Sequence, residues 1–115
     1  MADCLFCKLV AGEIPAKIVK RNGDAVAFHD IDPQAPVHVL VIPTRHIPAA
    51  RDVSGPEDEV LLGRVLAFAT QVASELGLDA GGYRLVSNTG PDAQQSVDHL
   101  HFHVLGGRQM RWPPG

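Results

Sequence analysis

The chain has 115 residues, 45% of them hydrophobic and 20% charged, which fits one globular domain spanning residues 1–115. A formal net charge of −3 gives no basic field for nucleic acid or an anionic membrane, and no apolar run is long enough to cross a bilayer. Charged residues interrupt the N-terminal region too early for a signal peptide, and the two cysteines suggest a reducing compartment, so we expect a cytoplasmic protein.

The first part of the chain predicts a short helix followed by strands. Residues 3–11 place apolar side chains at helical spacing, with Asp3 as the expected cap and Gly12 as the stop. The Asn22-Gly23 pair is a turn signal between two strand-like runs. The predicted strands of this region are residues 16–21, 25–30 and 37–43.

A long amphipathic helix is predicted over residues 54–77. Ser54 and Glu57 have the spacing of a capping box, Pro56 falls in the first turn, and Gly77 ends the pattern. One apolar stripe runs along this helix and is expected to face the core: Leu61, Val65, Phe68, Ala69, Val72 and Leu76.

Two more strands are predicted at residues 83–88 and 97–105, with a polar loop between them. Short turns join several of the strands, and the long helix lies between the third and the fourth. The expected fold is therefore α+β, with a five-stranded, mostly antiparallel sheet, one long helix and a short N-terminal helix.

Three of the six histidines, His99, His101 and His103, alternate within the last predicted strand. On a regular strand they share one face, and the outer two are about 13 Å apart. That distance argues against one metal ion held by all three, although two neighbours could share zinc with a ligand from elsewhere. The alternatives are a histidine-rich solvated face and a structural metal site.

Histidine also acts as a nucleophile, and a neighbouring imidazole can hold phosphoryl oxygens. His101 can be assisted from both sides, which makes it the expected nucleophile in an attack on phosphorus. The loop before the histidines offers main-chain N–H groups and short polar side chains to an anion. Its candidate residues are Asn88, Gln94, Gln95 and Ser96.

The run His99-Leu100-His101-Phe102-His103-Val104-Leu105 resembles the signature of the histidine-triad (HIT) superfamily. The segments "EIPAKIV", "AFHDIDPQAP", "HVLVIP", "QSV" and "GGRQM-WPPG" look like its HINT branch, the purine nucleoside phosphoramidases, and cover essentially the whole chain. The resemblance implies a homodimer that cleaves nucleoside 5′-phosphoramidates, such as AMP-amide, AMP-lysine or aminoacyl-adenylates. A nucleotidyl-histidine intermediate would then be hydrolysed to AMP or GMP, with no cofactor required for catalysis.

By matching position, the resemblance makes His101 the nucleophile and His103 a ligand of the phosphate oxygens. His99 would support the environment of His101, and His38 would lie behind the nucleophile and orient its ring. Ser96 would contact the phosphate and the leaving group.

The same resemblance assigns the nucleotide contacts. Asp30 would accept both ribose hydroxyls, and Asn88 would contact the phosphate or ribose. The wider nucleotide site would comprise Phe6, Leu9, Ile14, Ile31, Gln94, Gln95, Ser96, His101, Phe102 and His103. Ala93 and Gln94 stand where glycines are usual in the animal proteins of this branch, and Asp98 replaces an aromatic residue.

Many bacterial members pair a C-x-x-C motif with two histidines. In this chain the corresponding set is Cys4, Cys7, His46 and His99, which suits a structural zinc ion. The alternative is that the two thiols are only buried helix side chains.

Other functions stay open at this stage. A non-catalytic nucleotide-binding module would keep the pocket without turnover, and a metal-dependent hydrolase would lose activity on chelation. Within the superfamily, a dinucleoside polyphosphate hydrolase or a nucleotide phosphorylase is the second choice. The "WPPG" tail favours the phosphoramidase branch.

Overall fold

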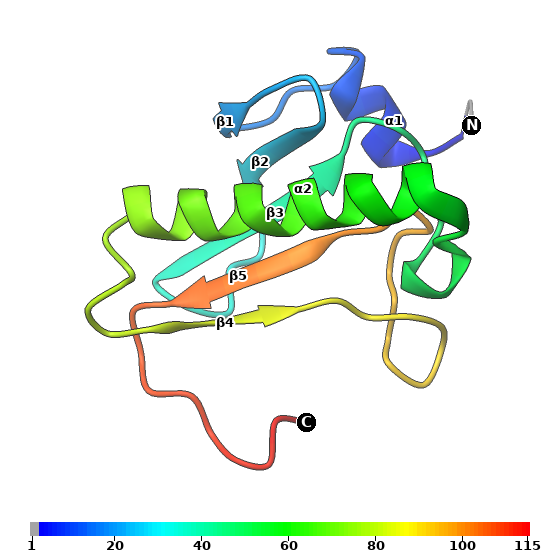
Figure 1. The fold of residues 1–115 in the computed structure, drawn as a ribbon. Coiled ribbons are helices and arrows are strands. Elements are labelled where there is room, and N and C mark those ends of the chain that lie inside the picture. Colours follow the sequence, from blue (N-terminus) through cyan, green and yellow to red (C-terminus); the bar gives the residue numbers. More distant parts are fainter. Residues whose placement is uncertain (1–2) are drawn as a thin grey trace.

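The computed structural model describes residues 3–115 and contains one five-stranded sheet with the strand order β1-β2-β3-β5-β4 (Figure 1). All neighbouring strands are antiparallel, which confirms the predicted α+β architecture. The elements are α1 (Leu5–Val10), β1 (Ile18–Arg21), β2 (Ala25–His29), β3 (Val37–Pro43), a 3-10 turn (Ala50–Asp52), α2 (Gly55–Glu75), β4 (Tyr83–Val86) and β5 (Phe102–Gly106).

Each face of the sheet carries one helix. The long helix α2 packs its predicted apolar stripe on one face, against alternate residues of the central strands such as Val39, Val41 and Val104. The short helix α1 covers part of the other face, where Phe6 and Leu9 pack on residues of β2 and β3. Strand alternation therefore separates a main core under α2 from a smaller core under α1.

The functional side chains lie on the α1 face. His38 is next to Val39 in β3, and so it points away from α2. Leu40, two residues further on, lies opposite His103 in β5. The long connection from β4 to β5 runs out at the end of the sheet where α1 lies (Figure 1).

The helix starts differ in detail from the predictions. The residue that caps α1 is Cys4 instead of Asp3, and its sulfur accepts the main-chain N–H of Cys7. The predicted capping box of Ser54 is wrong, because its side chain makes no capping bond and its N–H donates to Asp58. No helix within residues 3–115 is long and apolar enough to cross a membrane.

The last predicted strand needs the largest correction, because β5 begins only at Phe102. Residues 97–101 form no ladder; the N–H of Leu100 donates to the carbonyl of Ile47 instead. His99 and His101 therefore precede the strand, and the three histidines do not form one regular row. The predicted strand over 83–88 likewise ends at Val86.

Candidate functional site

The ring of His101 is buried and held by the carbonyl group two residues earlier. Its Nδ1 lies 2.7 Å from the main-chain oxygen of His99. A carbonyl oxygen can only accept a hydrogen bond, so Nδ1 carries the proton of the neutral ring and Nε2 keeps its lone pair. Phe6 contacts the ring edge-on, with 5.3 Å between the centroids. The protein thus holds one imidazole in the orientation and tautomer that a nucleophile requires.

His38 and His103 form a second pair of rings beside His101. The N–H of Gln34 donates to His38 Nδ1 over 2.9 Å, which places the proton of the neutral ring on Nε2. His38 Nε2 lies 2.8 Å from His103 Nδ1 and 3.4 Å from a carboxylate oxygen of Asp30. His103 Nδ1 is then the acceptor, and its Nε2–H is left as a donor. The expected role of His38 is therefore corrected, because this ring orients His103 and not His101.

Burial lowers the pKa values of three histidines of this region. The pKa of His103 falls from 6.5 to about 4, first through burial and then through the charges of His101 and His38. Burial also lowers the pKa of His38, against the opposing charge of Asp30, and it lowers the pKa of His99. Since the ring centroids of His101 and His103 are 5.2 Å apart, His103 presents a neutral N–H donor beside the ring of His101 at neutral pH.

A cavity of about 610 Å³ lies on the α1 face, and its lining includes residues that are neighbours of these histidines. Its wall includes Phe6, which touches His101, and Leu40, which is paired with His103. The lining is mostly apolar, as is usual for sites that bind a planar ring. It consists of Leu5, Phe6, Leu9, Ile14, Pro15, Ala16, Lys17, Phe28, His29, Asp30, Ile31, Leu40, Ser96 and Val97.

Several residues predicted to contact a nucleotide meet at this cavity, although they are far apart in the sequence. They are Phe6, Leu9, Ile14, Asp30, Ile31 and Ser96. Sequence reasoning missed Leu5, Pro15, Ala16, Lys17, Phe28, His29, Leu40 and Val97. The alternation of the strands was a usable signal for Phe28 and Leu40, which share the face of His38.

Six predicted nucleotide contacts are absent from the cavity lining: Asn88, Gln94, Gln95, His101, Phe102 and His103. Phe102 packs into the core under α2, because it alternates with His103 along β5. Asn88 follows the end of β4, and Gln94 is exposed in the connecting loop. The side chain of Gln95 is engaged in hydrogen bonds within the protein.

Sulfur and nitrogen donors form a separate cluster where α1 meets the residues before β5. Its members are Cys4, Cys7, His46 and His99, and their donor atoms all lie within 4.8 Å of one another. The Nδ1 atoms of the two histidines are 3.2 Å apart. Cys7 Sγ is 3.3 Å from His46 Nδ1 and 3.6 Å from His99 Nδ1, and Cys4 Sγ is 3.4 Å from His99 Nδ1.

These separations fit a tetrahedral zinc ion. Zinc bound to nitrogen at 2.0–2.1 Å and to sulfur at 2.3 Å gives edges of about 3.3 Å between nitrogens and about 3.6 Å between nitrogen and sulfur. His99 Nε2 lies 3.0 Å from the carbonyl oxygen of Pro43, which leaves Nδ1 unprotonated and available as a ligand. Burial and the neighbouring Cys4 raise the pKa of the Cys7 thiol, a cost that a bound cation would remove.

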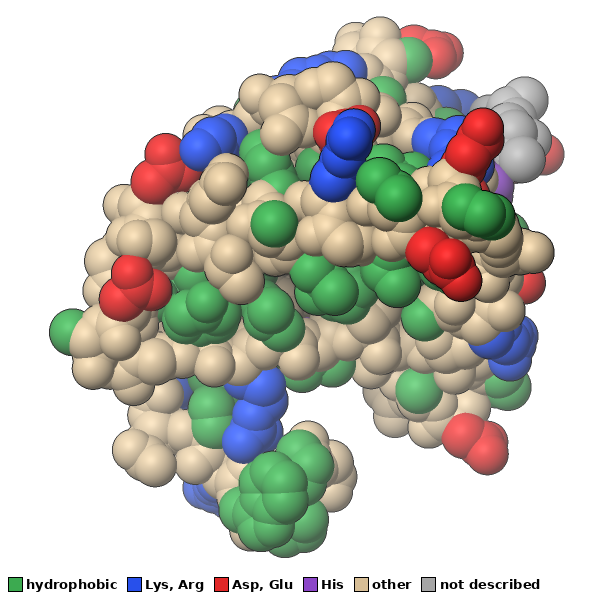
Figure 2. All heavy atoms as spheres, viewed as in Figure 1, with side chains coloured by type: hydrophobic (Ala, Val, Ile, Leu, Met, Phe, Trp, Pro, Cys, Tyr) green, Lys and Arg blue, Asp and Glu red, His purple; other side chains and the backbone are tan. Residues whose placement is uncertain are grey.

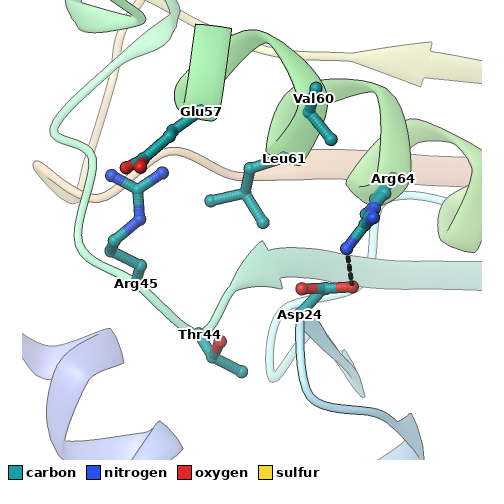
Figure 3. Close-up of a pocket in the computed structure, with 7 residues that line it drawn as sticks. All are labelled: Asp24, Thr44, Arg45, Glu57, Val60, Leu61 and Arg64. Carbon is teal, nitrogen blue, oxygen red and sulfur yellow. Dashed lines mark ion pairs between the residues drawn. The ribbon is translucent and has the colours of Figure 1, made fainter.

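A smaller cavity of about 310 Å³ lies at the first turns of α2, away from the histidines (Figure 3). Its two arginines are already neutralised: Arg64 lies 3.6 Å from Asp24, and Arg45 lies 2.6 Å from Asp58. The ion pair of Arg64 and Asp24 closes one side of this cavity in the figure. We therefore place the candidate site at the histidines.

Comparison with known proteins identifies the family of this chain. Residues 11–110 match the HIT domain family. The chain is 48% identical over 113 residues to an uncharacterised HIT-like protein of Synechocystis, covering 98% of this chain and 97% of the relative. The crystal structure of a HIT family hydrolase from Legionella pneumophila superposes with a TM-score of 0.94 at 49% identity, covering 98% of this chain and all of the other. A histidine triad nucleotide-binding protein from Candida albicans has a TM-score of 0.81 at 33% identity, over 96% of this chain and 83% of that one.

Proposed function

The chain belongs to the HIT domain family, and on this basis we propose that it hydrolyses purine nucleoside 5′-phosphoramidates through a nucleotidyl-histidine intermediate. One observation carries the proposal: the bond from His101 Nδ1–H to the carbonyl of His99 leaves the lone pair of Nε2 for attack. Two solved relatives are described as a hydrolase and a nucleotide-binding protein, in agreement with this class of reaction.

In the first half-reaction, Nε2 of His101 attacks the α-phosphorus of the substrate. An N–P bond forms to the ring while the P–N bond to the leaving amine breaks, and the amine departs with a proton from solvent. The Nε2–H of His103 stabilises the charge that grows on the phosphoryl oxygens. The serine at position 96, on the rim of the same cavity, contacts the phosphate and the leaving group.

In the second half-reaction, water attacks the same phosphorus and releases a proton to solvent. A P–O bond forms, the bond to His101 breaks, and the nucleoside monophosphate leaves. The base lies in the apolar cavity between Phe6 and Ile31, and the carboxylate of Asp30 accepts the ribose hydroxyls. Asp30 Oδ1 already accepts the N–H of Asp32, so this carboxylate is oriented before the substrate arrives.

The test is hydrolysis of adenosine 5′-phosphoramidate by the wild type and His101→Ala, each with and without a chelator. We expect wild-type turnover in both conditions and a loss of at least about 10³-fold in the variant, as for removal of other covalent nucleophiles. Gln71→Ala, on the exposed side of α2, is the control. Full activity of His101→Ala would overturn the assignment of His101 as the nucleophile. Faster cleavage of diadenosine polyphosphate than of the phosphoramidate would assign the chain to another branch of the HIT superfamily.

The proposal includes a structural zinc ion held by Cys4, Cys7, His46 and His99. It would fix α1 to the segment before β5 and leave His101 and His103 free for catalysis. The donor distances given above support this assignment. Elemental analysis should find about one zinc per chain in the wild type and little in Cys4→Ser, whereas equal metal content in the two proteins would contradict it.

The proposal also includes a homodimer. Strand β4 is at the edge of the sheet, and Figure 2 shows hydrophobic side chains in a row along the flank of α2 that faces β4. The partly buried hydrophobic residues that α2 and β4 pack against the main core are Leu62, Leu66, Tyr83 and Leu85. An open strand edge beside apolar side chains favours pairing with a second copy. Light scattering should show a dimer that Leu66→Glu dissociates and that Val60→Glu, on an exposed part of α2, does not.

A further inference from the structure

The side-chain amide of Gln95 makes three hydrogen bonds that help to hold the loop between β4 and β5 in place. Its Oε1 accepts the main-chain N–H of Gly90 over 2.9 Å, at the start of the loop. Its Nε2 donates to the carbonyl of Val97 over 3.1 Å, at the end of the loop, and to the carbonyl of Pro48 over 2.7 Å. One side chain thus joins both ends of the loop and ties them to the segment after β3.

The backbone of this loop is shaped so that the amide can reach all three partners. The N–H of Gln95 donates to the carbonyl of Gly90, which closes the turn. Gln94 has a φ of 61°, in the left-handed region, and Gly90 has a φ of 81°. A Cβ atom at Gly90 would lie 3.1 Å from the Arg51 guanidinium, so the loop also packs closely against the 3-10 turn.

Ser96 lies between two of the clamped positions and is itself free. Within residues 3–115, neither its main-chain N–H nor its hydroxyl has a hydrogen-bond partner, and the residue is exposed on the rim of the cavity. Leu100 is also tied to the segment after β3, through the carbonyl of Ile47. The segment after β3 therefore holds the residue before Ser96, through Pro48, and the residue before His101, through Ile47.

We propose that Gln95 is a positioning residue of the phosphate site, which fixes Ser96 relative to His101 and His103 without contacting the nucleotide. This inference rests on the proposed function and replaces the expected direct nucleotide contact of Gln95. Its effect falls on the reacting end of the substrate, because the base and ribose contacts come from α1 and the end of β2. Misplacement of one such group by about 1 Å can cost 10²-fold in rate.

The experiment compares Gln95→Ala, Ser96→Ala and the double variant with the wild type, using adenosine 5′-phosphoramidate. We expect Gln95→Ala to lower kcat by about 10- to 100-fold while KM changes less than about threefold. If Gln95 acts through Ser96, the double variant should be no slower than the slower single variant. The positioning role would be overturned if the loss of kcat in the double variant equalled the product of the two single losses. It would also be overturned if Gln95→Ala acted only by raising KM. Gln71→Ala is the control.

Two readouts keep this inference separate from the choice of substrate. Calorimetry should show that Gln95→Ala weakens the binding of AMP several-fold and leaves the binding of adenosine unchanged. Amide hydrogen exchange at Gly90 should become faster in the variant, since the Gly90 N–H loses its acceptor, Gln95 Oε1. Unchanged hydrogen exchange and an unchanged ratio of AMP affinity to adenosine affinity would reject the positioning role of Gln95. A wild type that binds AMP but does not cleave the phosphoramidate would reject the proposed reaction alone.

Discussion

The carbonyl group of His99 accepts a 2.7 Å hydrogen bond from Nδ1 of His101, while the ring of His99 faces two cysteines and His46. One residue therefore belongs to two sites, with its main chain in the nucleophile site and its side chain in the cysteine–histidine cluster. A change in the cluster can reach His101 through a single main-chain group.

Removal of the proposed zinc ion should loosen the protein and displace His101. Without a cation, the buried His99 ring and the two thiols lose their common ligand, and α1 loses its attachment to the residues before β5. We expect Cys4→Ser to lower the unfolding midpoint by several degrees and to slow phosphoramidate hydrolysis. Thermal unfolding with and without a chelator checks this, because the chelator should destabilise the wild type and leave Cys4→Ser unchanged.

Loss of His38 should impair the reaction without abolishing it. His38 holds His103 through a 2.8 Å bond, so its removal frees that ring to rotate but leaves the nucleophile in place. We expect His38→Ala to lower kcat by about 10- to 100-fold, less than His101→Ala does. Steady-state kinetics on both variants measures the difference, and an equal loss in the two would contradict the separation of roles.

Stability should fall as the pH decreases from 6.5 toward 4. The pKa of His103 is lowered to about 4 by burial and by its histidine neighbours, and an unfolded chain titrates at 6.5. Between these values the unfolded state binds more protons, so the free energy of unfolding decreases with decreasing pH and is constant above this range. In denaturant titrations, the free energy of unfolding of His103→Gln should depend less steeply on pH than that of the wild type. His29→Gln, which changes an exposed histidine, should keep the wild-type slope.

Substitutions at Gln94 should follow its left-handed backbone. Glycine adopts a φ of 61° at little cost, whereas a β-branched side chain is a strained outlier there. We expect Gln94→Gly to be neutral or slightly stabilising and Gln94→Val to cost about 1–2 kcal/mol. Denaturant unfolding checks both, with Ala93→Val in the same loop as the matched control. A Gln94→Val protein as stable as that control would contradict the assigned backbone conformation.

The sequence alone determined most of the fold. Local patterns predicted three features that the structure confirms: the apolar stripe of α2, the turn at Asn22-Gly23 and strand β3. The structure also brings the C-x-x-C motif together with His46 and His99, the set that the sequence analysis named. Local patterns are sufficient for such features because the periodicity of the backbone fixes which side chains share a face.

Only the tertiary structure decided how the site is divided. The three alternating histidines predicted one strand face, but the bond from Leu100 to Ile47 removes residues 97–101 from the sheet and sends the His99 ring to the cysteines. The partnership of His38 with His103 and the clamp of Gln95 likewise depend on contacts across tens of residues. Hydrogen bonds between distant segments leave no periodic trace in a sequence, and here one of them determines which nitrogen atom of His103 is left as a donor.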